Sequence, residues 1–343
     1  MDFTLSDEQL MFAETARTLL GDTCNSEHWR KLMEQDSAFD PARWAALVEN
    51  GFTLLMLPEG VGGLGLAELD MALIAQEAGY VALPEPLAES AGVAMPMLAA
   101  LAPEHPLLAD PAAIVALAPA INPVVAAADQ ARAILIERDG HAWLAPREAV
   151  TLTPAPTIDP LRRVFRIEWN PATAEDLGPA DWGLAYDRAA LFAAAQGLGM
   201  AQRSVDLAVA YAKDRTQFGK PIGSYQAVKH HLASAQVAIE FARPVVLAAA
   251  AGIGAQDVYS RARVSHAKIV ALEAADLAAR SAIQVHGGMG YSWEVDVHLF
   301  LKRTLALTHA WGTPAHHRGR VAERLFTRTA GPDQTFAREA RHA

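Results

Sequence analysis

Apolar residues recur at helical spacing through the second half of the chain. Leu191, Leu198, Val205 and Ala212 stand seven residues apart, with further alanines between them. A stripe of this kind covers one face of a helix and is typical of a helix that is buried on that face. Similar long segments are predicted at about 224–251, 257–285, 294–310 and 313–329. Four or five long helices joined by short links form a bundle.

Shorter helices are predicted in the first 110 residues. Ser6, followed by Gln9, is a typical helix start, and Pro41 after Asp40 suits the first turn of another helix. Two more helices are expected at about 67–79 and 85–101. The segment 57–65 between them is a glycine-rich loop that lacks the G-x-G-x-x-G order, so it does not predict a dinucleotide-binding fold.

The pattern changes between about residues 110 and 181. Residues 112–117 and 133–136 are apolar runs of strand length, and residues 164–169 alternate between apolar and charged side chains. Asp139-Gly140 is a hairpin turn signal. We therefore expect a small β unit with few strands. The predicted fold is mainly α, with domains at 1–110 (helical), 111–181 (reduced middle β) and 182–330 (helical bundle), and a tail at 331–343.

Composition excludes several functional classes. The 343 residues carry a formal net charge of −10, which argues against general nucleic-acid binding because that function needs a basic face. Cys24 is the only cysteine, so no intramolecular disulfide can form and a reducing compartment fits. The acidic N-terminus is unlike a signal peptide, and no uninterrupted apolar stretch is expected to cross a membrane. These features predict a soluble cytoplasmic protein.

Two polar, glycine-containing loops interrupt the predicted bundle. The first, residues 214–226, contains Arg215, Gln217 and Phe218, and the second, residues 284–291, contains Gln284 and the pair Gly287-Gly288. A guanidinium, an amide and exposed backbone N–H groups just before a new helix suit a pyrophosphate or a ribose. Either loop alone is better explained as a helix cap with a surface ion pair. The two together, in this order and at this separation, form a more specific pattern.

That pattern resembles the acyl-CoA dehydrogenases, whose C-terminal domain carries an Arg-x-x-Phe-Gly loop followed by Gln-x-x-Gly-Gly-x-Gly. Residues 3–20 resemble the family's opening helix, and residues 44–65 resemble its tryptophan, Pro-Glu and Gly-Gly-x-Gly stretch. The resemblance covers most of the chain and is weakest at its centre. It implies a helical N-terminal domain, a middle β domain and a C-terminal four-helix bundle.

The resemblance also implies chemistry. Members desaturate an acyl-CoA between Cα and Cβ: a glutamate removes the α proton, and FAD takes the β hydrogen as hydride. The flavin ring lies against the β domain and bundle of one subunit, and loops of a neighbouring subunit hold its adenosine pyrophosphate. By resemblance, those neighbour contacts are the two loops' Arg215, Gln217, Phe218, Gln284, Gly287 and Gly288.

The residue expected to act as the base departs from this pattern. The family's Tyr-Glu-Gly-Thr motif falls, without gaps, on residues 310–313, so Trp311 stands where the glutamate would be. An indole cannot accept a proton. Some members place the base on an earlier helix, and aligning Ala267-Lys268 with the family puts that position at Arg261, which stays protonated. Asp257 is the one nearby carboxylate, and a helix N-cap explains it better.

The middle region departs as well. It has no equivalent of the family's Thr-Glu-rich strand or of its Gly-x-Lys-x-x-Ile-Thr strand, which implies that the chain cannot hold a flavin ring of its own. The two departures resemble the heterotetrameric acyl-CoA dehydrogenases of bacterial steroid degradation. This resemblance implies a larger homologous partner in an α2β2 assembly, an FAD shared with that partner, and a bulky acyl-CoA substrate. It also implies electron transfer to an electron-transferring flavoprotein.

Two alternatives stay open at this point. The chain could be an autonomous flavoenzyme with a displaced base, with Asp257 as the candidate, or a scaffold that has lost flavin. No catalytic or metal-binding role is predicted for the other polar residues. The histidines at 230–231, 309 and 316–317 lack metal-ligand spacing, and Ser204 and Ser265 have no His–Asp partners. Glu240 and Trp293 are expected to be structural, the first in a salt bridge and the second in packing.

Overall fold

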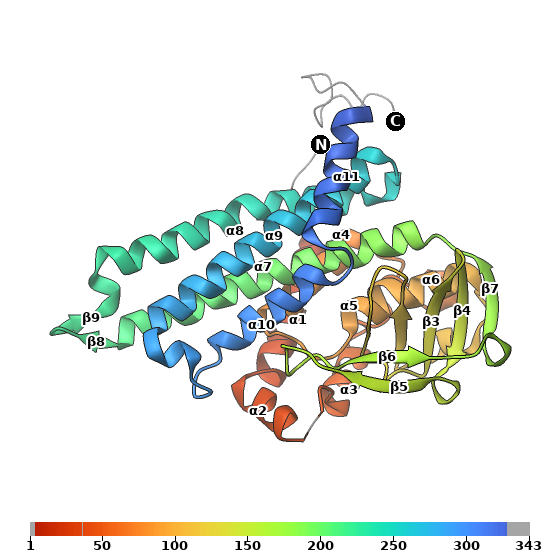
Figure 1. The fold of residues 1–343 in the computed structure, drawn as a ribbon, viewed down its shortest axis with the longest axis horizontal. Coiled ribbons are helices and arrows are strands. Elements are labelled where there is room, and N and C mark those ends of the chain that lie inside the picture. The colour runs from red at the N-terminus through yellow and green to blue at the C-terminus, as the bar shows by residue number, and fades with distance from the viewer. Residues whose placement is uncertain (1–3, 36, 328–343) are drawn as a thin grey trace.

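The computed structural model describes residues 4–35 and 37–327, and it has a long helical bundle at one end and β-sheets at the other (Figure 1). The N-terminal helices pack beneath the bundle and beside the sheets. This is the predicted class, mainly α with a small β region. The N-terminal helices are α1 (Asp7–Thr23), α2 (Ser26–Glu34), α3 (Pro41–Glu49), α4 (Glu68–Tyr80), α5 (Leu87–Glu89) and α6 (Met95–Leu101).

Local capping explains where these helices begin. Ser6 and Gln9 form the reciprocal hydrogen bonds of a capping box at α1, and Asp40 caps α3 with Pro41 in its first turn. The expected helix at 85–101 is α5 and α6, joined by a π-helical segment, Ser90–Ala94. Helix α2 was not predicted. Asn25 caps it, but its apolar face consists mainly of Trp29 and Leu32, too few positions to reveal a period.

The middle region contains more strands than the expected few. Seven strands form two sheets, in the orders β1-β3-β4-β7 and β2-β6-β5. Strands β1 and β3 are parallel, and the other neighbours are antiparallel. The predicted hairpin turn joins β3 to β4, with Asp139 and Gly140 both at positive φ as a type I′ turn requires. The strands are β1 (Val115–Ala118), β2 (Val125–Ala126), β3 (Ala133–Arg138), β4 (His141–Pro146), β5 (Thr151–Ala155), β6 (Val164–Glu168) and β7 (Glu175–Pro179).

Helix α9 lies at the centre of the bundle and contacts α7, α8, α10 and α11. The heptad stripe of α7 is buried as predicted. Helix α10 starts later than the expected residue 294, because Ser292 to Asp296 form a turn before it. The expected tail at 331–343 lies outside the described residues. The bundle helices are α7 (Trp182–Asp214), α8 (Gln226–Gly252), α9 (Val258–His286), α10 (Val297–His309) and α11 (Pro314–Thr327).

Helix α8 corrects one expectation. Together with the short turn that follows it, this helix is long and apolar enough to cross a membrane by length and composition, although no such stretch was expected. It packs along α7 and α9, however, and its Gln236 exchanges hydrogen bonds with Gln202 of α7. Glu240 lies near Arg243 in the next turn, in the structural role expected for it. Helix α8 is thus a bundle helix in this fold.

One large apolar cluster extends through all three regions, from Ala16 of α1 through Ile134 of β3 to Leu307 of α10. The predicted boundaries near 110 and 181 therefore separate regions of different secondary structure that share a core. The division into domains stays a prediction.

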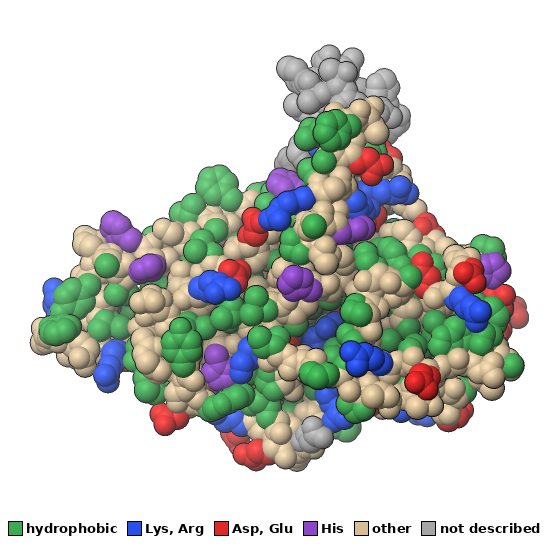
Figure 2. All heavy atoms as spheres, in the orientation of Figure 1, with side chains coloured by type: hydrophobic (Ala, Val, Ile, Leu, Met, Phe, Trp, Pro, Cys, Tyr) green, Lys and Arg blue, Asp and Glu red, His purple; other side chains and the backbone are tan. Residues whose placement is uncertain are grey.

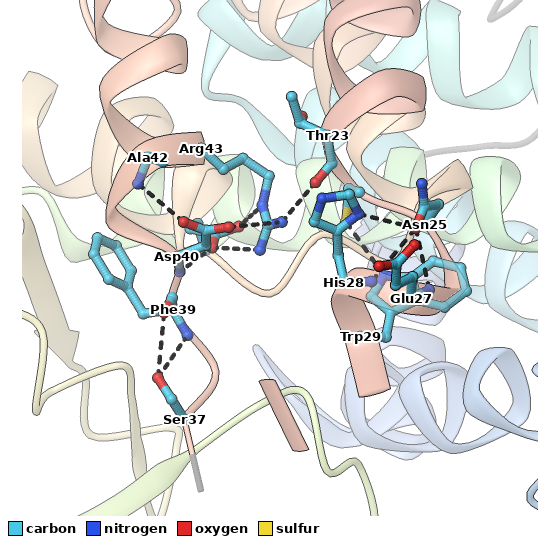
Figure 3. Close-up of polar contacts among 12 residues, drawn as sticks. Thr23, Asn25, Glu27, His28, Trp29, Ser37, Phe39, Asp40, Ala42 and Arg43 are labelled. Carbon is cyan, nitrogen blue, oxygen red and sulfur yellow. Dashed lines mark hydrogen bonds and ion pairs between the residues drawn. The ribbon is translucent and has the colours of Figure 1, made fainter. Parts of the chain in front are cut away.

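A buried ion pair joins the N-terminal helices to this core. The Arg43 guanidinium, 1% exposed, donates two 2.8 Å hydrogen bonds to the Glu85 carboxylate and a third to the Thr23 carbonyl. Figure 3 shows Arg43 lying between Asp40 and Thr23. Glu85 also accepts the backbone N–H of Asp40. The pair thus fixes the positions of α1 and α3 against the segment that leads into α5.

Replacing Glu85 by Ala is expected to lower the free energy of unfolding by about 3–5 kcal/mol, because it leaves the Arg43 charge buried without a counter-ion. Urea denaturation measures the loss. The control is Glu14→Ala, which removes an exposed partner of Arg17 and should cost less than about 1 kcal/mol. Equal effects of the two substitutions would contradict the assignment.

Candidate functional site

The two predicted loops meet at the end of the bundle that lies farthest from the sheets (Figure 1). Helices α7 and α9 both end there, and α8 begins there. The Tyr211 and His286 rings, from the last turns of α7 and α9, stack with centroids 4.2 Å apart. A small separate apolar cluster beneath them includes Ala212, Leu232 and Ile283. This cluster gives the loops a rigid base of their own.

The first loop is a two-stranded hairpin that projects from this end. Strands β8 (Thr216–Gln217) and β9 (Lys220–Pro221) are joined by Phe218 and Gly219, both at positive φ, as a type I′ turn requires. Phe218 is 92% exposed, so no packing inside this chain compensates for its left-handed backbone. Strained and exposed side chains of this kind are a mark of functional positions.

Charge at this end is positive although the chain as a whole is acidic. The backbone of Arg215 is fixed by its N–H bond to Tyr211 O and by the bond from Ile222 N to its own carbonyl. Its side chain is exposed and has no carboxylate partner within residues 4–35 and 37–327. Lys213, Lys220 and Lys229 are exposed around it. The Gln217 side chain is exposed too, so a guanidinium and an amide face solvent together.

The second loop lies at the C-terminal end of a helix, which corrects the expectation of glycine N–H groups just before a new helix. Gly287, at φ 60°, ends α9 by donating to Gln284 O, and residues 287–291 form a single 3-10 turn. A helix C-terminus carries a partial negative charge, so the dipole does not favour an anion here. An anion at this end would therefore be attracted by the basic side chains and by the N-terminus of α8.

The glycines of this loop still allow close approach of a ligand. A Cβ at Gly287 or Gly288 would meet no atom within 4 Å, and both glycines are exposed among the described residues. Gln284 is exposed beside them. Trp293, expected to pack, is instead 57% exposed, with the Lys302 ammonium over its ring. The donors and uncovered backbone at this end fit the ribose and pyrophosphate of a nucleotide.

Trp311 stands in a tight turn close to the β region, at the position expected for the base. The residue is 4% exposed, and its backbone φ is 58°. Its backbone N–H donates to Asn122 Oδ1 of the β1–β2 loop at 2.8 Å. The Lys268 ammonium donates to the Ala310 and Gly312 carbonyls on either side. These contacts fix the backbone of the turn that carries Trp311, and its correspondence to the family's base position stays a prediction.

Two titratable groups beneath this turn have lowered pKa values, which favours their neutral forms. Burial, reinforced by Arg162, lowers the pKa of Lys268 to about 7. Burial next to Lys268 lowers the pKa of His317 to about 3. The His317 ring donates from Nε2 to Trp311 O, so its Nδ1 accepts from the Ser265 hydroxyl. Sequence analysis missed these roles, because Lys268 and Ser265 stand in an otherwise regular apolar stripe.

The alternative base positions do not supply a free carboxylate. Arg261 is exposed on α9. Asp257 accepts the N–H groups of Tyr259 and Ser260 as the N-cap of α9, as expected. Asp187, which sequence reasoning missed, is buried on α7 and lies 2.6 Å from Arg320. Burial raises its pKa, which Arg320 opposes. No cluster of potential metal ligands occurs among the described residues.

The junction of the β region with the helices is closed. Its cavity measures only about 30 Å³, room for roughly two waters. Ion pairs seal it: Arg303 binds Asp159 together with two carbonyl groups, and Arg162 lies 3.6 Å from Glu89. An isoalloxazine ring does not fit this space. The donors at the far end of the bundle thus lie well apart from this narrow junction.

Comparison with protein families agrees with this geometry. The family model described as "Acyl-CoA dehydrogenase, C-terminal domain" matches residues 179–326, and the corresponding N-terminal model matches residues 6–105. The chain is 34% identical to acyl-CoA dehydrogenase IpdE2 of Mycolicibacterium smegmatis over 94% of its own length and all of the relative. It is 35% identical to IpdE2 of Mycobacterium tuberculosis over 88% of its own length and 92% of the relative.

Solved structures share the fold. The ChsE4–ChsE5 complex from Mycobacterium tuberculosis contains a chain that superposes with a TM-score of 0.87 at 25% identity, covering 96% of this chain and all of that one. The Tcur3481–Tcur3483 steroid ACAD G363A variant gives a TM-score of 0.85 at 22% identity, covering 94% and 99%.

The fold and site thus define an oxidoreductase of the flavoprotein type. The chain belongs to the acyl-CoA dehydrogenase family, which uses FAD.

Stability is expected to depend on pH through Lys268. In the unfolded chain its pKa is near 10.5, so between pH 7 and 10.5 the unfolded lysine holds a proton that the folded one has lost, and stability rises with pH across that window. Relative to Lys268→Met, the wild type should gain about 2 kcal/mol of unfolding free energy from pH 7 to 9. Denaturant titrations at both values measure this.

The control for this measurement is Lys229→Met. Lys229 is exposed, so its substitution should leave the pH dependence of the wild type unchanged. A difference between wild type and Lys268→Met that stays constant from pH 7 to 9 would show that Lys268 keeps its proton when folded.

Proposed function

We propose that this chain is one subunit of a heteromeric, FAD-dependent acyl-CoA dehydrogenase that introduces an α,β double bond into an acyl-CoA thioester. Its part is to bind the ADP end of an FAD whose ring lies in a larger homologous subunit. The observation that carries the proposal is the uncompensated, exposed donor set around Arg215 in a chain whose base position is filled by the buried ring of Trp311.

The separation of these two regions supports a shared site. Lys268, beneath the Trp311 turn, and Gln284, in the nucleotide loop, are sixteen residues apart on α9, or about 24 Å along its axis. The nucleotide loops project away from this chain's own sheets (Figure 1). They are therefore well placed to reach a coenzyme held by another subunit.

The partner would supply both the carboxylate base and the ring pocket. The FAD whose ADP end these loops would hold would supply the hydride acceptor for the β hydrogen. The work of this chain is then electrostatic: Arg215 and its neighbouring lysines neutralise the pyrophosphate, Gln217 and Gln284 offer amides to its polar groups, and Phe218 offers an apolar face. We further propose an α2β2 assembly in the cytoplasm that passes electrons to an electron-transferring flavoprotein.

For the acyl group we propose a bulky one, such as a steroid side chain or a ring remnant. One structural neighbour is titled a steroid ACAD, and two neighbours are complexes of unlike subunits. Neither alternative has comparable support. Asp257 is engaged as a helix cap, so a displaced base there would have to break the start of α9. A scaffold without flavin would leave the strained, exposed hairpin without a role.

Co-expression with the larger homologous subunit is expected to give a yellow complex, and Arg215→Ala in that complex should weaken FAD binding about 10- to 100-fold. This range corresponds to the roughly 1.5–3 kcal/mol of a hydrogen bond to a charged group. Flavin absorbance per protein after dialysis measures the effect. Arg166→Ala, which removes an exposed guanidinium of β6 in the β region, serves as the control. Unchanged flavin content and activity in Arg215→Ala would remove the proposed role.

Asp257→Asn tests the displaced base. Asparagine caps a helix as well as aspartate does, so folding should be retained and turnover of the complex should stay within about twofold of the wild type. Steady-state desaturation of an acyl-CoA with a ferrocenium acceptor provides the measurement. Abolished turnover with intact thermal stability would favour the autonomous enzyme instead.

A further inference from the structure

Two aromatic rings join the ends of α7 and α9 beneath the nucleotide loops. The planes of the Tyr211 and His286 rings lie within 20° of each other, and their centroids are 4.2 Å apart. The other ring pairs among the described residues are tilted or edge-on, with centroids at least 4.7 Å apart. The one stacked pair in the described part of the chain therefore lies at the end of the bundle that carries the candidate site.

Each ring is fixed to the loop that follows it. Tyr211 O accepts the N–H of Arg215 at 2.9 Å, and His286 is the last residue of α9, next to Gly287. The His286 Nδ1 lies 2.8 Å from Ala282 O. Because a carbonyl oxygen can only accept, Nδ1 carries the hydrogen, and the ring cannot turn without losing this bond. A shift of either ring therefore moves one of the two loops.

The other contacts between these helix ends are small. In the separate apolar cluster at this end, the buried side chains that α7 contributes are Ala208 and Ala212. Tyr211 packs against the same cluster and is the largest side chain that α7 brings to it. Aromatic rings bury much more surface than a methyl group does, and a stacked pair adds an attraction of its own. The stack is thus the main side-chain contact that sets the position of α7 against α9 at this end.

The donors above the stack come from both helix ends. Arg215 and Gln217 are exposed on the hairpin, and Gln284 is exposed on α9. Figure 2 shows Lys and Arg side chains at the left end of the molecule, where the hairpin projects in Figure 1. Donors on two separate segments bind one ligand more tightly when their spacing is fixed before the ligand arrives, because less ordering is left for the binding step.

We propose that Tyr211 and His286 are a positioning pair, which holds the hairpin and the glycine loop at the separation that one nucleotide diphosphate requires. The inference rests on the proposed function and deepens it, because it names the residues that set the geometry of the nucleotide site. Neither ring has to touch the nucleotide, since each acts through the loop that follows it. Loss of a ring therefore lowers the affinity for FAD more than it changes the rate of the reaction at the flavin ring.

The test uses the complex of the full chain with the larger homologous subunit, freed of flavin and titrated with FAD while flavin fluorescence is recorded. His286→Ala is expected to raise the Kd for FAD about tenfold, the upper range for a stacked pair, whereas turnover at saturating FAD changes far less. His286→Phe keeps a flat ring and should recover most of the affinity. The matched control is Trp169→Leu, which breaks a ring pair in the β region and should leave the Kd unchanged.

A second substitution tests whether the two rings act together. Tyr211→Leu is expected to weaken FAD binding as much as His286→Ala does. In the double variant the two losses should not add, because either substitution alone already breaks the stack. Thermal melting of each complex checks that it is folded at the assay temperature. If the His286→Ala complex is not folded there, Tyr211→Leu decides in its place.

The outcomes separate this inference from the proposed function. If the wild-type complex binds no FAD, or if Arg215→Ala binds it as tightly as the wild type, the proposed function is wrong. If Arg215→Ala weakens FAD binding and the folded ring variants do not, the function stands and the positioning pair is wrong. The pair is also wrong if His286→Phe binds FAD as weakly as His286→Ala, or if the losses from the two rings add in full.

Discussion

The packing of α9 on four other helices is the constraint on which the rest of the molecule depends. Because α7, α8, α10 and α11 all contact it, this helix is straight and rigid enough to hold two sites at a fixed separation. Near its middle, Lys268 fixes the Trp311 turn, and at its end Gln284 and Gly287 form part of the nucleotide loops.

The junction between the β region and the helices is narrow because ion pairs occupy it. A catalytic subunit must keep an empty space between its sheets and its bundle, lined by groups whose charges are unsatisfied until ligand binds. Here Arg303, Asp159 and Arg162 fill that space and bond to one another and to the backbone. Buried ion pairs add little net stability when complete, but they prevent collapse into an alternative packing. They also connect α10 to the loop between β5 and β6.

The helices could be predicted from sequence because their signals are local. The seven-residue stripe of α7, the cap at Ser6 and the proline at residue 41 all act within one or two turns. The β region was predicted less well. Strand β5 contains Pro154 and is largely exposed, and β7 is short and polar, so neither shows an apolar alternation. The family's loops were recognisable by residue type, but their position at helix C-termini was not, because glycine suits both a C-cap and the approach to a new helix.

The turn that carries Trp311 shows more clearly what the sequence alone could not predict. An ungapped count predicts that Trp311 occupies the family's base position, whereas the groups that hold the backbone of its turn come from three distant segments. Asn122, Lys268 and His317 converge only in the folded chain. Their contacts show that the tryptophan is integrated into the core and is not a simple loss of function. The turn is supported from the β region, α9 and α11, so Trp311 has a structural role whatever the chemistry of its position.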